Sequence, residues 1–377
     1  MLQRFVLTSL CLLSPLALAM AERELDPSKP KGADSLFRVH YGDKWGFMLR
    51  DGQVVIPPQF DWAGAFFEQR GRVYVRKETE MKVGYIDPTG QFVIEPTFDE
   101  GGDFREGLAP VRVGKEWGFI DRQGRFVVSP SFQAAGEFHE GLARVMYCPG
   151  ETLPPFPYRV LTDSLRLLIE SGSMFADRNV RFGFIDRTGR MTIEHQPWEM
   201  ADDFSEGLAW VRGRDLKCRY INRQAQFAFD QCFDLAEGFS EGLAWVMVEG
   251  KCGYIDKLGS FSIPLQFYTC RSFSDGLAVV AEPPADEEAP MRKGAIDKSG
   301  RYVFAPTFRG LTDFSEGLAI AKKDSNRVFI DKDGKTVHLT DIPLDWWGFR
   351  DGLAIVGTGG KRVYIDRTGK VVAPFEK

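Results

Sequence analysis

A phrase of about nine residues recurs along the whole chain and constrains its fold more than any other feature. The phrase joins a Trp-Gly or related pair to an aromatic residue, Ile-Asp and a turn glycine, as in EWGFIDRQG at 116–124 and RFGFIDRTG at 181–189. A second phrase, of the type FSEGLAWV at 204–211, follows most copies about 23 residues later. Self-similarity at a fixed period indicates a repeat architecture, so we expect stacked units rather than one asymmetric core.

The spacing between copies gives the size of the unit. Three of the eight gaps between successive copies are 34 residues long, and the longest gap, of 65 residues, contains an insert at 148–178. The glycine of the Trp-Gly pair, or the residue aligned with it, lies at Gly46, Gly84, Gly118, Gly183, Arg219, Gly253, Gly294, Val328 and Val363. The chain is therefore predicted to contain about nine units of roughly 34 residues.

This pattern resembles the bacterial WG repeat, also called the KWG repeat. The W-G pairs at 45–46 and 117–118, the recurrent I-D-x-x-G turns and the E-G-L-A phrases carry the resemblance, which covers residues 35–377. Other units carry different residues in the Trp position, among them Val83 and Cys252. The resemblance implies a β-rich repeat module of extracytoplasmic or surface-associated bacterial proteins, and it implies no particular activity.

Each unit is predicted to contain three short strands. Strand a is the W-G-F-I-D segment, strand b follows its turn, as in FVIEP at 92–96, and strand c follows the Glu-Gly turn, as in LAPVRV at 108–113. Alternation places Phe119 and Ile120 on opposite faces of strand a, which indicates a strand buried on both sides by neighbouring units. The repeated order c-a-b fits an open β-solenoid or superhelix, and equally a closed, propeller-like ring. We expect the open array, because propeller blades usually have four strands.

Residues 1–21 are predicted to be a secretory signal peptide. Arg4 precedes an apolar stretch, and Ala19-Met20-Ala21 forms an A-x-A site, so we expect cleavage between Ala21 and Glu22. The mature protein is then periplasmic or secreted, with a linker at 22–34 and the repeat array at 35–377. No other apolar run approaches the ~18 residues of a transmembrane helix, so no integral membrane segment is expected. A short helix is predicted within the insert, at TDSLRLLIESG.

Charge and histidine placement narrow the function classes. The net charge of −5, with both signs interspersed, gives no reason to expect a nucleic-acid partner. The four histidines share no metal-ligand spacing, and neither a nucleophile elbow nor a phosphate-binding loop is present, so no metal and no cofactor is expected. Carboxylates are plentiful, and a pair of them suited to hydrolysis stays open as an alternative.

Two registers of acidic residues follow the repeat. The Asp of the I-D-x-x-G turn, such as Asp331, could ligate a cation, but a side chain that caps its own turn is the simpler interpretation. The acid of the E-G-L-A phrase, such as Glu106, could bind a cationic partner or only keep an edge soluble.

Cysteines and tryptophans supply the candidate site residues. Cys218 and Cys252 occupy the same strand position in successive units, so stacking could join them in a disulfide; otherwise each is a small apolar residue in the Trp position. Tryptophans outside the W-G pair could be exposed stacking platforms or parts of the core, and they are Trp210, Trp245, Trp346 and Trp347.

The sequence therefore favours a non-catalytic binding or scaffold protein over an enzyme. Its partner is expected to be a protein or a cell-envelope glycan, held by an extended surface that includes these tryptophans and the insert at 148–178. The alternative is an envelope hydrolase acting on glycan or peptide, with a carboxylate-based cleft across several units.

Overall fold

The computed structural model describes residues 36–147, 180–282, 290–323, 326–340, 342–344, 348–357 and 362–374. These residues form strands and turns, and none of them is helical. The predicted signal peptide, linker and insert fall on residues outside the described ranges. The strands of the described residues form nine small antiparallel sheets that follow one another along the chain.

The nine sheets are the blades of a β-propeller, numbered here from the N-terminus. Blade 1 comprises β1 (Phe37–Tyr41), β2 (Lys44–Met48) and β3 (Val54–Phe60). Blade 2 comprises β4 (Trp62–Phe67), β5 (Arg70–Lys77), β6 (Glu80–Ile86) and β7 (Phe92–Phe98). Blade 3 comprises β8 (Glu100–Gly101), β9 (Leu108–Val113), β10 (Glu116–Asp121) and β11 (Phe126–Phe132). Blade 4 comprises β12 (Ala134–His139), β13 (Leu142–Tyr147), β14 (Arg181–Asp186) and β15 (Met191–Gln196). Blade 5 comprises β16 (Met200–Ala201), β17 (Ala209–Arg212) and β18 (Cys218–Ile221). Blade 6 comprises β19 (Leu235–Ala236), β20 (Ala244–Val248), β21 (Lys251–Ile255) and β22 (Phe261–Phe267). Blade 7 comprises β23 (Thr269–Cys270), β24 (Ala278–Ala281), β25 (Lys293–Ile296) and β26 (Tyr302–Phe308). Blade 8 comprises β27 (Gly310–Leu311), β28 (Leu318–Lys323), β29 (Asn326–Asp331) and β30 (Thr336–Val337). Blade 9 comprises β31 (Leu353–Val356), β32 (Val363–Asp366) and β33 (Val371–Pro374).

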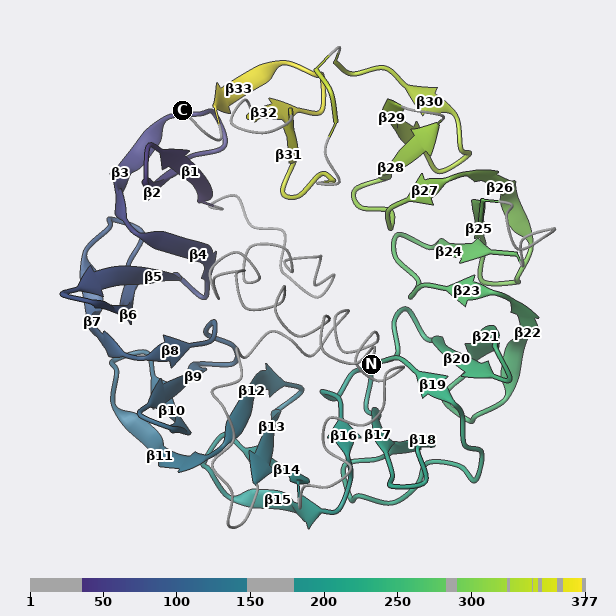
Figure 1. Cartoon of the computed structure of the whole chain (residues 1–377), viewed down its shortest axis with the longest axis horizontal. Coiled ribbons are helices and arrows are strands. Elements are labelled where there is room, and N and C mark those ends of the chain that lie inside the picture. Colours follow the sequence, from purple (N-terminus) through teal and green to yellow (C-terminus); the bar gives the residue numbers. More distant parts are fainter. Residues whose placement is uncertain are drawn as a thin grey trace, which may run out of the picture.

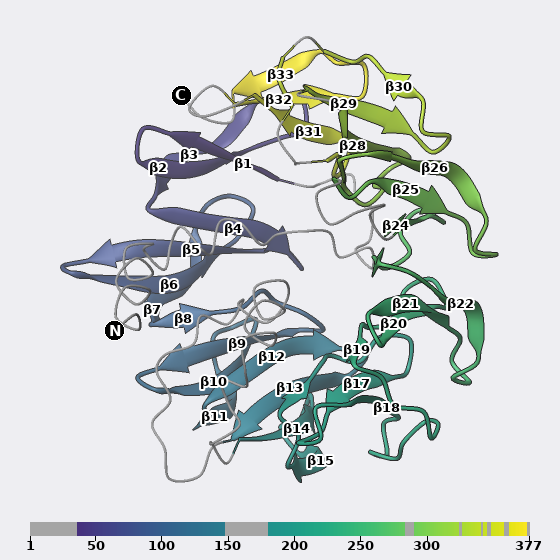
Figure 2. The ribbon, with the colours of Figure 1, turned by 45° about the vertical axis from the view of Figure 1, so that its right-hand side comes forward.

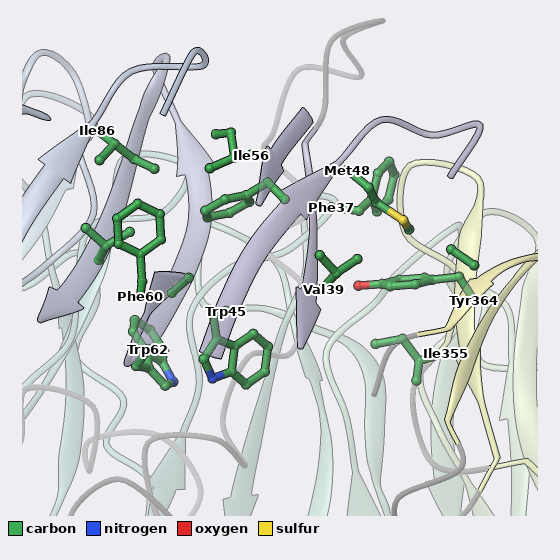
Figure 3. Packing of buried hydrophobic residues seen from close by; sticks show 14 of the residues in the cluster. Phe37, Val39, Trp45, Met48, Ile56, Phe60, Trp62, Ile86, Ile355 and Tyr364 are labelled. Atoms are coloured by element: carbon green, nitrogen blue, oxygen red, sulfur yellow. The ribbon is translucent and has the colours of Figure 1, made fainter. Parts of the chain in front are cut away.

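The blades close into a ring around a central opening (Figure 1), and a second view shows the same circular arrangement (Figure 2). At the closure, the hydroxyl of Tyr364 in blade 9 donates a hydrogen bond of 3.0 Å to the carbonyl of Arg38 in blade 1. Ile355 and Tyr364 share a buried cluster with Phe37 and Val39 (Figure 3). The closed ring is therefore correct, and the expected open solenoid is wrong.

That expectation failed because the unit was assigned three strands. In most blades the segment before the recurrent Phe adds a fourth, inner strand, which pairs with strand c and faces the ring centre. Several of these inner strands span only two residues, such as β8 and β19. A strand of two residues has no alternation that a sequence pattern could reveal. Strands c, a and b themselves lie where the repeat predicts them.

The glycine of the W-G pair is required by the approach of strand b. Between Trp117 and Phe119 the pairing of β10 with β11 shifts register, so β11 bulges over Gly118. A Cβ on Gly118 would lie 2.5 Å from the carbonyl oxygen of Val128. Blade 5 carries Arg219 at this position, and its outer segment makes only isolated bridges to β18.

Successive blades pack through two repeated contacts. The residue in the Trp position covers a small residue on the inner strand of the next blade: Trp117 and Ala135 share one buried cluster, and Trp45 and Ala63 share another. The aromatic residue of strand a meets the recurrent Phe of the next blade edge to face, at 4.9 Å between ring centroids for Tyr85 and Phe104. The repeat thus describes the interface between blades as well as each blade.

Candidate functional site

A cavity of about 1050 Å³ is lined by the loops of blades 2 to 8 that hold the recurrent Phe and the acid of the E-G-L-A phrase. These loops extend from the inner strands towards the central opening (Figure 1). Carboxylates predominate among the charged groups of its lining, whereas the basic groups there are Arg105 and His139. A cavity of this size with several convergent polar groups is the strongest candidate binding site of the described residues.

The acids of the E-G-L-A phrase link neighbouring blades. In blades 2 to 8 the acid at this position accepts a hydrogen bond from the backbone N–H of the matching glycine in the next blade, as Glu106 does from Gly141 at 2.9 Å. The other acid–glycine pairs are Glu68–Gly107, Glu140–Gly207, Glu206–Gly242, Glu241–Gly276, Asp275–Gly317 and Glu316–Gly352. These acids therefore form a series of hydrogen bonds between neighbouring blades.

Basic residues neutralise part of that register. The residue after the Asp of the I-D-x-x-G turn reaches the acid of the preceding blade, as Lys257 Nζ does to Glu206 Oε2 at 3.0 Å. Lys298 reaches Glu241 at 3.2 Å in the same way. The turn aspartates serve structure too: the Asp366 carboxylate accepts hydrogen bonds from its own turn, which holds its pKa below the ordinary value.

A second set of acids stands one residue before the recurrent Phe and reaches back to the preceding blade. Asp103 lies 3.3 Å from Arg72 Nε, and both side chains are buried. Asp203 lies 3.5 Å from Arg144 Nε and 3.8 Å from His139 Nε2. The buried pair of Arg72 and Asp103 fixes the geometry of blades 2 and 3, because removal of one partner leaves a buried charge.

Two further acids stand two residues before the recurrent Phe, in blades 5 and 6. They are Asp202 and Glu237, and both line the cavity. Blade 3 has Gly102 at the matching position. The pKa of Asp202 is raised, first by burial and then by the neighbouring charge of Asp203. Sequence reasoning missed these two acids, and their only signal is an acid where earlier units have glycine.

The residue after the recurrent Phe divides the rim of the cavity. In blades 2 to 4 this position carries the large side chains Phe67, Arg105 and His139. In blades 5 to 8 it carries serine, namely Ser205, Ser240, Ser274 and Ser315. Each of these hydroxyls donates to the carbonyl of the Phe in the next blade, at 2.7 to 2.8 Å. Half of the rim is therefore lined by short side chains.

The structure places the tryptophans in the interfaces between blades. Trp245 is 3% exposed and packs against Cys270 of the next blade, so it is not an exposed stacking platform. Trp210 is half-buried and packs beside Phe239 of the next blade. Trp346 and Trp347 lie outside the described residues.

The disulfide differs from the expected one. Cys252 in blade 6 is bonded to Cys270 in blade 7, and Cys218 is a buried free thiol. A Cys218–Cys252 bond, one of the two possibilities that the sequence left open, does not form, because the Trp position of one blade faces the inner strand of the next blade. The residue of blade 6 that matches Cys270 is Ala236.

The described ranges contain no helix with the length and apolar character needed to cross a membrane. Within the same ranges, no group of three or more His, Cys, Asp or Glu side chains is placed to hold a metal ion.

Comparison with known proteins gives a family match. A family model described as "WG containing repeat" matches residues 45–78, 84–117, 117–147, 182–213, 219–252, 253–282 and 294–326, more than half of the chain. No curated protein gives a match.

The solved structures that give a match are distant in sequence. BamB from Moraxella catarrhalis is 9% identical with a TM-score of 0.41, over 78% of this chain and 92% of that one. A prolyl endopeptidase is 12% identical with a TM-score of 0.42, over 82% of this chain and 48% of that one. The WD40 β-propeller domain of Doa1 is 10% identical with a TM-score of 0.29, over 79% of this chain and 95% of that one.

Proposed function

Because the chain belongs to the family of WG-containing repeats, we propose that it is a non-catalytic binding or scaffold protein whose central cavity binds a positively charged segment of a partner protein. The observation that carries this proposal is the cavity of about 1050 Å³, to which seven successive blades contribute and in which carboxylates outnumber basic groups. A concave surface lined by one sign of charge concentrates partners of the opposite sign.

A protein partner is favoured over a cell-envelope glycan. Sugar rings are commonly held by exposed aromatic faces, whereas Trp245 is buried between blades and Trp210 is half-buried there. The phenylalanines that line the cavity are themselves largely buried, and most of its polar side chains are carboxylates and serines, with Arg105 and His139 as the basic groups. A segment rich in lysine or arginine complements this lining. The periplasm or the outside of the cell is the proposed location.

The test is binding of a basic peptide to the purified protein. Fluorescence anisotropy would compare a labelled peptide of alternating lysine and glycine with its glutamate counterpart at increasing salt. Carbodiimide coupling, which joins lysine amines to nearby carboxylates, would then mark the contact site. We expect binding of the lysine peptide alone, weakened by salt, with cross-links in the cavity loops. Absence of binding, or cross-links confined to outer-strand acids such as Glu95 and Glu194, would refute the proposal.

One observation favours a second candidate, a carboxylate-based hydrolase. Asp202 has a raised pKa and stands next to Asp203, and hydrolases often pair a carboxylic acid that stays protonated with one that is ionised. In that case Asp202 would donate the proton to the leaving group. Soluble fragments released from isolated cell walls by the wild-type protein, and not by Asp202→Asn, would support this candidate. No release from either protein would favour the binding function.

A further inference from the structure

The protein already binds one guanidinium group within its own ring. Arg105 of blade 3 lies over the ring of Phe67 in blade 2, with its guanidinium carbon 4.6 Å from the ring centroid. Its Nε donates to Glu137 Oε2 of blade 4 at 3.2 Å. The side chain is thus held between an aromatic face and a carboxylate, both supplied by flanking blades. These are the contacts that distinguish a guanidinium from an ammonium group.

Blades 5 and 6 lack a basic side chain at the position of Arg105. Ser205 and Ser240 stand there, and their hydroxyls are turned to the backbone of the next blade. The same two blades add the carboxylates of Asp202 and Glu237 to the cavity. This part of the rim, defined by these four residues, is called the serine sector here.

The nearby basic groups are engaged elsewhere. Arg144 of blade 4 pairs with Asp203, and Arg271 of blade 7 pairs with Asp313 at 2.9 Å. Lys257 and Lys298 extend to acids of the inter-blade register. Arg144 also lowers the pKa of Asp202, so this one cation is shared between the carboxylates of Asp202 and Asp203.

Asp202 also sits in surroundings that favour a bound donor. The Nε1–H of Trp210 lies beside its carboxylate and lowers its pKa, but the pKa stays raised overall. Burial and the charge of Asp203 make ionised Asp202 unfavourable, and a cation placed against it relieves both effects.

We propose that the serine sector binds an arginine side chain of the partner protein. This inference rests on the proposed function and names the group that the central cavity recognises. A guanidinium offers five N–H donors in a planar fork, enough to meet the carboxylates of Asp202 and Glu237 together with a serine hydroxyl. An ammonium group is a point charge with three donors and satisfies fewer of these acceptors in one position.

The experiment is calorimetric titration of the intact protein with two peptides of the same length, one of alternating glycine and arginine and one of glycine and lysine. We expect the arginine peptide to bind at least fivefold more tightly. The double variant Asp202→Asn/Glu237→Gln is expected to weaken its binding at least tenfold. The matched control, Glu95→Gln/Glu194→Gln, removes two charges from exposed outer strands and should leave the affinity unchanged.

A second variant tests the sector without removing a charge from it. Ser205→Arg places an arginine at the position that Arg105 occupies in blade 3. We therefore expect it to weaken binding of the arginine peptide at least tenfold and to raise the thermal midpoint of the protein. Circular dichroism would confirm that both variants fold.

The outcomes separate this inference from the proposed function. Equal affinity for both peptides would overturn the preference for arginine. Unchanged binding to the double variant and to Ser205→Arg, with cross-links elsewhere in the cavity, would overturn the serine sector and leave the central cavity as the site. No binding of either peptide would overturn both.

Discussion

The disulfide between blades 6 and 7 offers a quantitative test of how the ring is held together. Cys252 and Cys270 are 18 residues apart and buried. Closing a loop of about 18 residues removes enough entropy from the unfolded chain to stabilise the folded state by about 3 kcal/mol. The variant Cys252→Ala/Cys270→Ala should therefore lose about 3 kcal/mol of unfolding free energy, in addition to the packing of two small side chains.

Cys218 supplies the matched control. It occupies the same strand position in blade 5, is equally buried, and carries a free thiol whose pKa burial raises to about 12. Cys218→Ala removes one sulfur from the same surroundings without breaking a bond, so it reports the packing loss per residue, about 1 kcal/mol.

Urea denaturation followed by tryptophan fluorescence measures all three proteins. We expect the double variant to lose about 3 kcal/mol more than twice the loss of Cys218→Ala. Reductant should weaken the wild-type protein and Cys218→Ala, which both keep the bond, and leave the double variant unchanged. If the double variant loses no more than twice the control, the bond does not constrain the unfolded chain as argued. If alkylation shows free thiols at Cys252 and Cys270 in the oxidised protein, the pairing itself is wrong.

Three further predictions follow from the repeated geometry. Gly118→Ala places a Cβ 2.5 Å from a backbone carbonyl oxygen and should lower the free energy of unfolding in urea by about 3 kcal/mol. The control Gly348→Ala, whose Cβ would have nothing within 4 Å, should change it by less than about 0.5 kcal/mol. Similar losses in the two variants would contradict the steric argument. Because the folded-state pKa of Asp202 is raised, ionisation of its carboxyl lowers the stability of the fold as pH rises through that pKa. Asp202→Asn should therefore raise the thermal midpoint at neutral pH and leave it unchanged in acid, where the carboxyl is neutral. An equal gain at every pH would point to a packing effect instead. Ala236→Cys should form a second inter-blade disulfide with Cys218, because these positions match Cys270 and Cys252. Alkylation followed by mass spectrometry would then find both of these cysteines protected from the reagent. Full alkylation of both would show that the two interfaces differ.

The sequence predicts the blade better than it predicts the ring. The repeat gives the number of units, the order of strands c, a and b, and the glycine turns, because alternation and turn residues act within a few positions. Closure depends on the rotation between neighbouring blades summed around the ring, and no single unit encodes that sum. The contact that completes the ring, Tyr364 with Arg38, joins residues at opposite ends of the described chain.

Prediction from the sequence has the same limit for the acidic residues of the candidate site. Glu106 is visible in sequence as one of a series, but its task depends on which backbone N–H lies opposite, and that N–H belongs to Gly141 in another unit. From the sequence alone the tryptophans could be surface anchors or parts of the core, because large aromatic residues serve both purposes. The structure decides this for Trp245, which lies in a buried cluster with Cys270, where one blade covers the next.

Departures from the repeat carry different meanings at different positions, and the structure tells them apart. Arg219 replaces the glycine under strand b, and the consequence is local: the outer segment of blade 5 no longer pairs along its length. Asp202 and Glu237 stand where blade 3 has Gly102, at a position that faces the cavity. A repeat protein tolerates the first kind of change because each blade contacts only its neighbours. The second kind concentrates charge in one sector of an otherwise periodic ring, and a ring that binds a partner through one sector needs such a break in its symmetry.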